Sequence, residues 1–116
     1  MTTQTVTTVN LERKRGDTRA IVFTISDSTG AINIASWTNF LLTVDPERYP
    51  ANADNNVFQV AGTFVTDGSD GQIAFIPPGT TDPGTYYYDA QCTDPAGGKV
   101  TFAEGRYKLR QDITKD

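Results

Sequence analysis

The alternation of apolar and polar residues in short runs is the feature that most constrains what this chain can fold into. Within residues 18–26, the side chains of Ile21, Phe23 and Ile25 share one face if the segment is extended. A period of two is typical of a half-buried β-strand, whereas an amphipathic helix repeats its apolar residues every three or four positions. The pattern therefore predicts an all-β fold.

Glycine, proline and aspartate separate the alternating runs, and the longest irregular stretch is residues 45–56. Gly62 marks a weak point or a bulge inside its run. With a first strand near the N-terminus the chain contains about seven or eight short strands, at the spacing of ~8–12 residues typical of sandwiches and barrels. The runs cover residues 18–26, 37–44, 57–66, 72–76, 85–93, 99–103 and 106–111.

The length of 116 residues fits a single domain. We place this domain at residues 10–116 and interpret residues 1–9 as an extended arm or a first strand. Cys92 is the only cysteine, so no intramolecular disulfide can form. In the run at residues 85–93 it lies on the same face as Tyr88 and Ala90, which is expected to point inward, so we expect it to be a buried small hydrophobic residue. The core must therefore be held by side-chain packing alone.

Several classes of function are disfavoured by what the sequence lacks. It contains no histidine, which removes Ser-His-Asp and Cys-His catalysis and the common zinc sites. Fourteen acidic against ten basic residues give a formal charge of −4, the opposite sign from a nucleic-acid binder. The longest apolar run, residues 20–23, is far too short to span a bilayer. We expect no enzymatic activity, no cofactor or metal, no nucleic-acid partner and no membrane segment.

A tyrosine corner is predicted where the Pro83-Gly84 turn leads into a late strand. In such a corner a tyrosine near the start of the strand bonds its hydroxyl back across the preceding turn, and Tyr86 is the candidate. Tyr88 stands where immunoglobulin domains carry their second cysteine. Aromatic packing is therefore expected to link the sheets in place of a disulfide.

The last strand pattern changes parity within residues 99–111. Successive side chains of a strand point to opposite faces, and Phe102 has an even residue number whereas Tyr107 and Leu109 have odd ones. All three can face inward only if the strand contains one extra residue. Such a residue makes a β-bulge, and Gly105 is the expected site.

The threonine-rich start of the chain is uncharged and has high β-propensity, which makes it an aggregation hazard as an exposed edge. It is expected either to pair within its own sheet or to add a strand to a neighbouring subunit. Aromatic side chains in the long loop and on an outward strand face are further candidate contacts. The candidate partner contacts are Thr2, Thr3, Thr5, Val6, Thr7, Thr8, Val9, Tyr49 and Tyr87, and the candidate structural residues are Gly84, Tyr86, Tyr88 and Gly105.

A set of ordered segments resembles a known family. They are KRGDT at 14–18, DSTG at 27–30, GQIAF at 71–75, PGTYYYDA at 83–90 and GRYKL at 105–109. Over residues 10–114 the chain is similar to the immunoglobulin-like N-terminal domain of phage baseplate upper proteins and to related small tail and virion proteins. The resemblance implies an immunoglobulin-like β-sandwich of antiparallel strands. It also implies a non-catalytic docking module within a virion, made in the cytoplasm of a bacterial host.

The partners implied are other virion proteins, including further copies of the chain. The loop at residues 45–56 is longer than the family pattern. We also expect no receptor-binding or fibre segment after residue 116. A capsid decoration protein is therefore one alternative to a tail, baseplate or neck component. A carbohydrate- or receptor-binding module is another, since exposed aromatics on β-sandwiches stack on sugars. Its candidate residues are Tyr49, Tyr87 and Trp37. A small hydrolase using Asp89, Glu104 or Asp112 is the least favoured.

Overall fold

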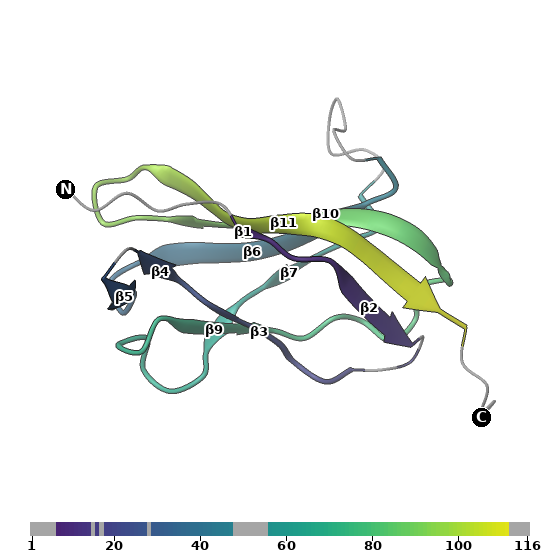
Figure 1. Cartoon of the computed structure of the whole chain (residues 1–116), viewed down its shortest axis with the longest axis horizontal. Coiled ribbons are helices and arrows are strands. Elements are labelled where there is room, and N and C mark those ends of the chain that lie inside the picture. The colour runs from purple at the N-terminus through teal and green to yellow at the C-terminus, as the bar shows by residue number, and fades with distance from the viewer. Residues whose placement is uncertain (1–6, 15, 17, 28, 48–55, 112–116) are drawn as a thin grey trace.

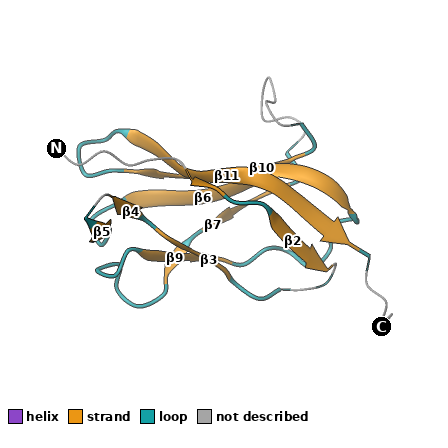
Figure 2. Ribbon diagram, in the orientation of Figure 1, coloured by secondary structure: helices purple, strands orange, loops and turns teal. Residues whose placement is uncertain are grey.

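Two layers of β-sheet make up the molecule. The computed structural model describes residues 7–14, 16, 18–27, 29–47 and 56–111, and within these ranges it contains eleven strands and no helix (Figure 2). The layers lie face to face along a common long axis (Figure 1). The all-β sandwich predicted from the sequence is confirmed. Tyr49 and residues 2–6 lie outside the described residues.

The larger layer, called the large sheet below, has the order β1-β11-β10-β6-β7, with β2 also pairing β11. The smaller layer, the small sheet, has the order β3-β9-β8, and β4 and β5 form a separate hairpin. This arrangement matches the two layers of immunoglobulin domains. The strands of the large sheet are β1 (Thr7–Thr8), β2 (Leu11–Lys14), β6 (Thr38–Asp45), β7 (Phe58–Ala61), β10 (Gly84–Thr93) and β11 (Lys99–Arg110). The others are β3 (Ile21–Thr24), β4 (Ser26–Asp27), β5 (Gly30–Ala31), β8 (Thr63–Phe64) and β9 (Gln72–Phe75).

The N-terminal strands differ from the expected antiparallel pattern because both run parallel to β11. Thr7 lies opposite Ala103, and Leu11 lies opposite Tyr107, so one register holds along the whole edge. The backbone N–H of Val9 donates to the carbonyl of Glu104 over 2.9 Å. Residues 7–9 therefore pair within their own sheet, as one of the two sequence-based alternatives proposes.

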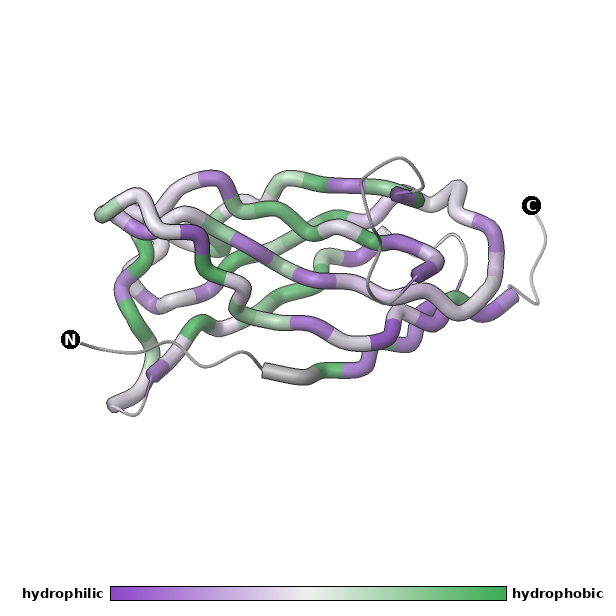
Figure 3. Tube along the Cα trace, turned by 90° about the horizontal axis from the view of Figure 1, so that it is seen from above, coloured by the Kyte–Doolittle hydropathy of each residue, from purple (hydrophilic) through white to green (hydrophobic). Residues whose placement is uncertain are grey.

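Aromatic side chains fill the space between the sheets. Phe23 of the small sheet lies 6.1 Å from Tyr88 and 5.9 Å from Phe102, measured between ring centroids. Both partners belong to the large sheet, so aromatic packing links the layers as predicted for a chain without a disulfide. Cys92 is 1% exposed within this core, and burial, with a smaller contribution from Asp94, raises the pKa of its thiol to about 12. The apolar stretches alternate with polar ones along the strands (Figure 3).

The single strand predicted at residues 57–66 is divided between the two sheets. β7 belongs to the large sheet and β8 to the small one, and Gly62 lies between them. A Cβ at Gly62 would come within 2.8 Å of side-chain atoms of Ile73 and Phe75. The chain crosses between the layers here because glycine permits this close approach.

The bulge predicted at Gly105 lies instead at Phe102. Ala90 is opposite Ala103 and Gln91 is opposite Thr101, so Phe102 is the extra residue of β11. Phe102 and Ala103 are consecutive, yet they are 3% and 1% exposed, which a regular strand facing solvent on one side does not allow.

Gly105 has a different role, since it sits in regular register opposite Tyr88. A Cβ built on Gly105 would lie 2.2 Å from the carbonyl oxygen of Val9. Glycine is therefore needed for the backbone at Val9, between β1 and β2, to pass close to β11.

The substitution Gly105→Ala is expected to lower the free energy of unfolding by about 1–3 kcal/mol, because the added methyl group forces the backbone of Val9 away. Urea denaturation followed by circular dichroism measures the change. Gly84→Ala is the matched control, since its Cβ would come no closer than 3.4 Å to Tyr86. Equal losses in the two variants would contradict the close-approach role of Gly105.

Candidate functional site

The side chain of Tyr88 ties the N-terminal strand to the middle of the large sheet. Its ring is 4% exposed, and its hydroxyl donates to the carbonyl oxygen of Val9 over 2.6 Å. Gly105, directly across from Tyr88, leaves the space in which this carbonyl lies. Burial, with a smaller contribution from the charge of Glu104, raises the pKa of Tyr88, so the phenol stays protonated and remains a donor.

The tyrosine corner is present in the structure. The hydroxyl of Tyr86 donates to the carbonyl oxygen of Asp82 over 2.7 Å, across the turn that contains Pro83 and Gly84. This is the hydrogen bond expected from the sequence, and it fixes the start of β10. Tyr86 and Tyr88 thus stabilise the strand from the inner face, which leaves the opposite face to other residues.

The outward side chains of β10 and β11 form the candidate functional site. Tyr87 lies half-buried on this face, opposite Arg106 on one side and Asp45 on the other. Asp45 is 4% exposed, and its Oδ1 accepts a hydrogen bond from the backbone N–H of Glu47 over 2.8 Å. The face is therefore built from polar and charged groups around one aromatic ring.

Two carboxylates are opposed in the middle of this face. Asp89 of β10 lies directly opposite Glu104 of β11, and both side chains are half-buried. Burial is the main cause that raises the pKa of Asp89, and the charge of Glu104 raises it further. The amide of Gln91, 3.3 Å away, and Lys99 act in the other direction. Like charges directly across a sheet are destabilising, so this arrangement costs folding free energy.

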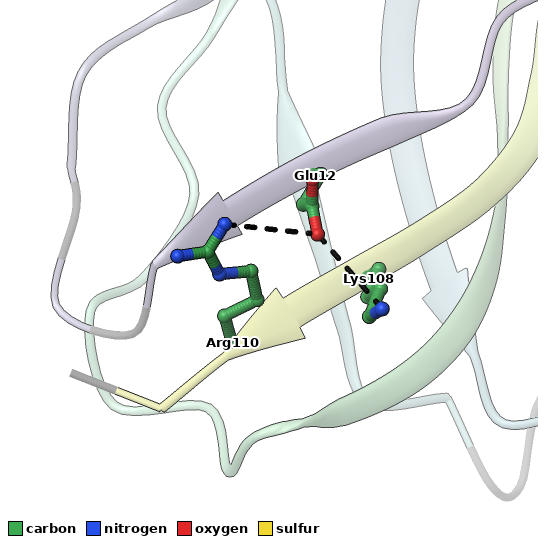
Figure 4. Close-up of polar contacts among 3 residues, drawn as sticks. All are labelled: Glu12, Lys108 and Arg110. Atoms are coloured by element: carbon green, nitrogen blue, oxygen red, sulfur yellow. Dashed lines mark ion pairs between the residues drawn. The ribbon is translucent and has the colours of Figure 1, made fainter.

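A second group of like charges, called the basic patch, lies toward the C-terminal end of β11. Lys14 is directly opposite Arg110, which repeats the unfavourable cross-strand pairing with the other sign. The carboxylate of Glu12 lies 3.9 Å from the ammonium of Lys108 and 4.0 Å from the guanidinium of Arg110 (Figure 4). All three of these side chains are about half exposed, so each ion pair contributes little. The basic patch consists of Lys14, Arg106, Lys108 and Arg110.

A hollow of about 380 Å³ lies within the basic patch. Its lining combines two cations and one carboxylate with uncharged side chains. The backbone N–H of Arg106 is held there by the side-chain oxygen of Asn10 over 3.0 Å. The hollow is lined by Asn10, Leu11, Glu12, Thr85, Arg106 and Lys108.

The aspartates in the turns have structural partners. Each accepts the backbone N–H of the residue two positions ahead, over 2.7–3.1 Å. This is the local hydrogen bonding that makes aspartate a turn residue. The described residues contain no group of three or more His, Cys, Asp or Glu side chains that could hold a metal ion. The turn aspartates are Asp27, Asp67, Asp70 and Asp94.

Trp37 and Tyr87 do not form a common aromatic surface. Trp37 packs against the core just before β6 begins, whereas Tyr87 lies opposite Asp45, where β6 ends. No helix in the described part of the chain is long and apolar enough to cross a membrane.

The sequence indicated part of this site. Tyr87 was identifiable from its outward parity, and the same parity, counted from the buried Tyr107 and Leu109, places the cations of β11 on the outer face. Lys14 could not be found in this way, because its position beside Arg110 depends on the parallel pairing of β2.

Comparisons with known proteins show the fold alone. No family model and no curated protein matches the chain. Among solved structures it is similar to CopC from Methylosinus trichosporium OB3b, with 8% identity over 93% of this chain and 91% of that one and a TM-score of 0.54.

Two other solved structures are less similar. One is the Bacteroides ovatus glucan-utilization protein SGBP-B in complex with a mixed-linkage heptasaccharide, with 17% identity and a TM-score of 0.40. The other is a 2,6-sialyltransferase from Photobacterium sp. JT-ISH-224, with 10% identity and a TM-score of 0.37. This chain spans 24% and 19% of those two chains, and neither likeness supports a functional conclusion.

The three consecutive tyrosines allow a matched test of the inner-face hydrogen bonds. Tyr88→Phe is expected to cost about 1–3 kcal/mol, because it leaves the carbonyl of Val9 without its donor. Tyr86→Phe is expected to cost about 0.5–1.5 kcal/mol, the usual contribution of one hydrogen bond. Tyr87→Phe, on the outer face, is the control and should change stability by less than about 0.5 kcal/mol. Urea denaturation measures the three free energies of unfolding. A smaller loss for Tyr88→Phe than for Tyr86→Phe would contradict the role of Tyr88 as the donor to Val9.

Removing one charge of the opposed carboxylates is expected to stabilise the fold. Asp89→Asn should raise the free energy of unfolding at neutral pH by about 0.5–1 kcal/mol. Because the folded-state pKa of Asp89 is raised, Asp89 of the wild type takes up a proton and loses its charge as pH falls through that pKa. The difference in unfolding free energy between the wild type and Asp89→Asn should therefore shrink over this range and vanish below pH 3.8.

Glu104→Gln is the matched partner in a double-mutant cycle with Asp89→Asn. Either single change removes the same repulsion, so the double variant should gain no more than the better single variant. Fully additive gains, or a loss of stability at neutral pH, would show that the two carboxylates do not oppose each other.

Proposed function

We propose that this protein is a non-catalytic docking module of a phage or prophage virion and that it binds other subunits through the outer face of the large sheet. The observation that carries the proposal is the opposition of Asp89 and Glu104 across β10 and β11. Two half-buried carboxylates in this position weaken the isolated fold. A cationic group of a neighbouring subunit would turn the repulsion into attraction.

The ring of Tyr87 adds to this surface. Tyrosine is enriched at protein interfaces because a rigid, amphipathic ring buries much area at little entropic cost. Tyr87 lies two residues from Asp89 on the same face of the same strand. A neighbouring subunit could therefore cover an aromatic anchor and the opposed carboxylates together.

The resemblance to baseplate-type immunoglobulin-like domains supports the virion setting. That family uses the sandwich as an attachment module, and a docking role requires no chemistry from the chain. A position in the neck or baseplate implies a low copy number per particle, whereas capsid decoration or a tail tube implies a high one. The N-terminal edge of the large sheet adds a further surface, since among the described strands β1 and β2 pair only with β11.

The proposal is tested by incorporation into particles. Asp89→Lys should reduce the amount of protein in purified virions by at least about tenfold, since a repelled or lost anchor costs more than about 1.4 kcal/mol. Val22→Lys is the matched control, because Val22 is 51% exposed on the outer face of the small sheet. Quantitative mass spectrometry of particles from the producing host measures both variants and the copy number. Equal incorporation of the two variants, or particles without the chain, would contradict the proposal.

A further inference from the structure

The basic patch is an excess of positive charge on an acidic protein. It gathers Lys14, Arg106, Lys108 and Arg110 close to Glu12, while the whole chain has a formal charge of −4. Three of the cations alternate along one strand, and the fourth faces the last of them across the sheet. Their mutual repulsion is relieved only in part by Glu12, so the patch favours an anionic partner.

The opposite end of the molecule carries the complementary charge. The β4–β5 turn, the loop before β9 and the β10–β11 hairpin lie at the same end of the molecule, away from the tips of β2 and β11 (Figure 1). These segments hold Asp27, Asp67, Asp70 and Asp94, which we call the acidic end, and Lys99 is the one cation beside them within the described residues. The long axis of the chain measures 48 Å, so the two charged regions are well separated.

We propose that the basic patch binds the acidic end of a second copy of this chain, in a head-to-tail arrangement. This inference rests on the proposed function, because it names one of the subunits that the docking module binds. The contact joins two different surfaces, so repetition generates a ring if the rotation closes and a filament if it does not.

The basic patch and the acidic end are complementary in charge. Asp67 is exposed in its turn, where its carboxylate accepts the backbone N–H of Ser69, and a hollow of about 380 Å³ lies between Glu12, Arg106 and Lys108. The hydroxyl and the backbone N–H of Ser69 hold the pKa of Asp67 below its usual range, so that carboxylate stays charged. Charged groups at the surface are screened by salt over ~10 Å, so the association must weaken as ionic strength rises.

Sedimentation velocity of the purified chain tests the proposal. At about 50 mM salt the sedimentation coefficient should rise with protein concentration, and at about 500 mM salt the chain should be a monomer. Lys108→Glu combined with Arg110→Glu should abolish the association, because it reverses the basic patch. Val22→Glu is a control for added negative charge outside both regions, on the outer face of the small sheet, and should leave the association intact.

Mixing two variants provides the sharper test. Asp27→Asn, Asp67→Asn and Asp94→Asn together remove three charges, while the asparagine oxygens keep the hydrogen bonds that hold the turns. Neither this variant nor the reversed one should associate alone. An equimolar mixture should form a dimer and stop there, since one chain supplies an acidic end and the other a basic patch.

A wild-type chain that stays monomeric at low salt would overturn the inference, as would unimpaired association of either variant alone or a mixture that stays monomeric. Circular dichroism confirms that each variant is folded. Failure here leaves the proposed function intact if Asp89→Lys still blocks incorporation into virions. The two ideas therefore fail separately.

Discussion

Burial of aromatic side chains between the two sheets decides which residues this molecule can present to a partner. No disulfide joins the layers, so Phe23, Tyr88 and Phe102 must meet in the core. Once these rings point inward, the pleat of β10 and β11 turns Asp89 and Glu104 to the outside. The outer face of the large sheet is thus a consequence of how the core is filled.

The outer face departs from what stability alone would select. Asp89 faces Glu104, and Lys14 faces Arg110, although a pair of opposite charges at either place would be more favourable. Local conflicts of this kind concentrate at functional sites, where binding compensates for them. Behind this face, Tyr86 and Tyr88 hold β10 in place from the inner side, through hydrogen bonds to the backbone carbonyls of Asp82 and Val9.

The sequence was sufficient for features that depend on local pattern. The period of two predicted the strands, and the Pro83-Gly84 turn predicted the hydrogen bond of Tyr86. Features that depend on distant partners were not predictable. The bulge falls at Phe102 because the core needs two consecutive residues inside, and Gly105 is reserved for the close approach of Val9. The basic patch requires the parallel pairing of β2 with β11, which no local signal encodes.

A reconstruction of the assembled particle by electron cryo-microscopy is the most direct test of the central claim, that the outer face of the large sheet is the docking surface. The account predicts a neighbouring subunit over Tyr87, Asp89 and Glu104, with a basic side chain between the two carboxylates. A particle in which that face is open to solvent, and the small sheet around Val22 and Ile76 is covered instead, would contradict it.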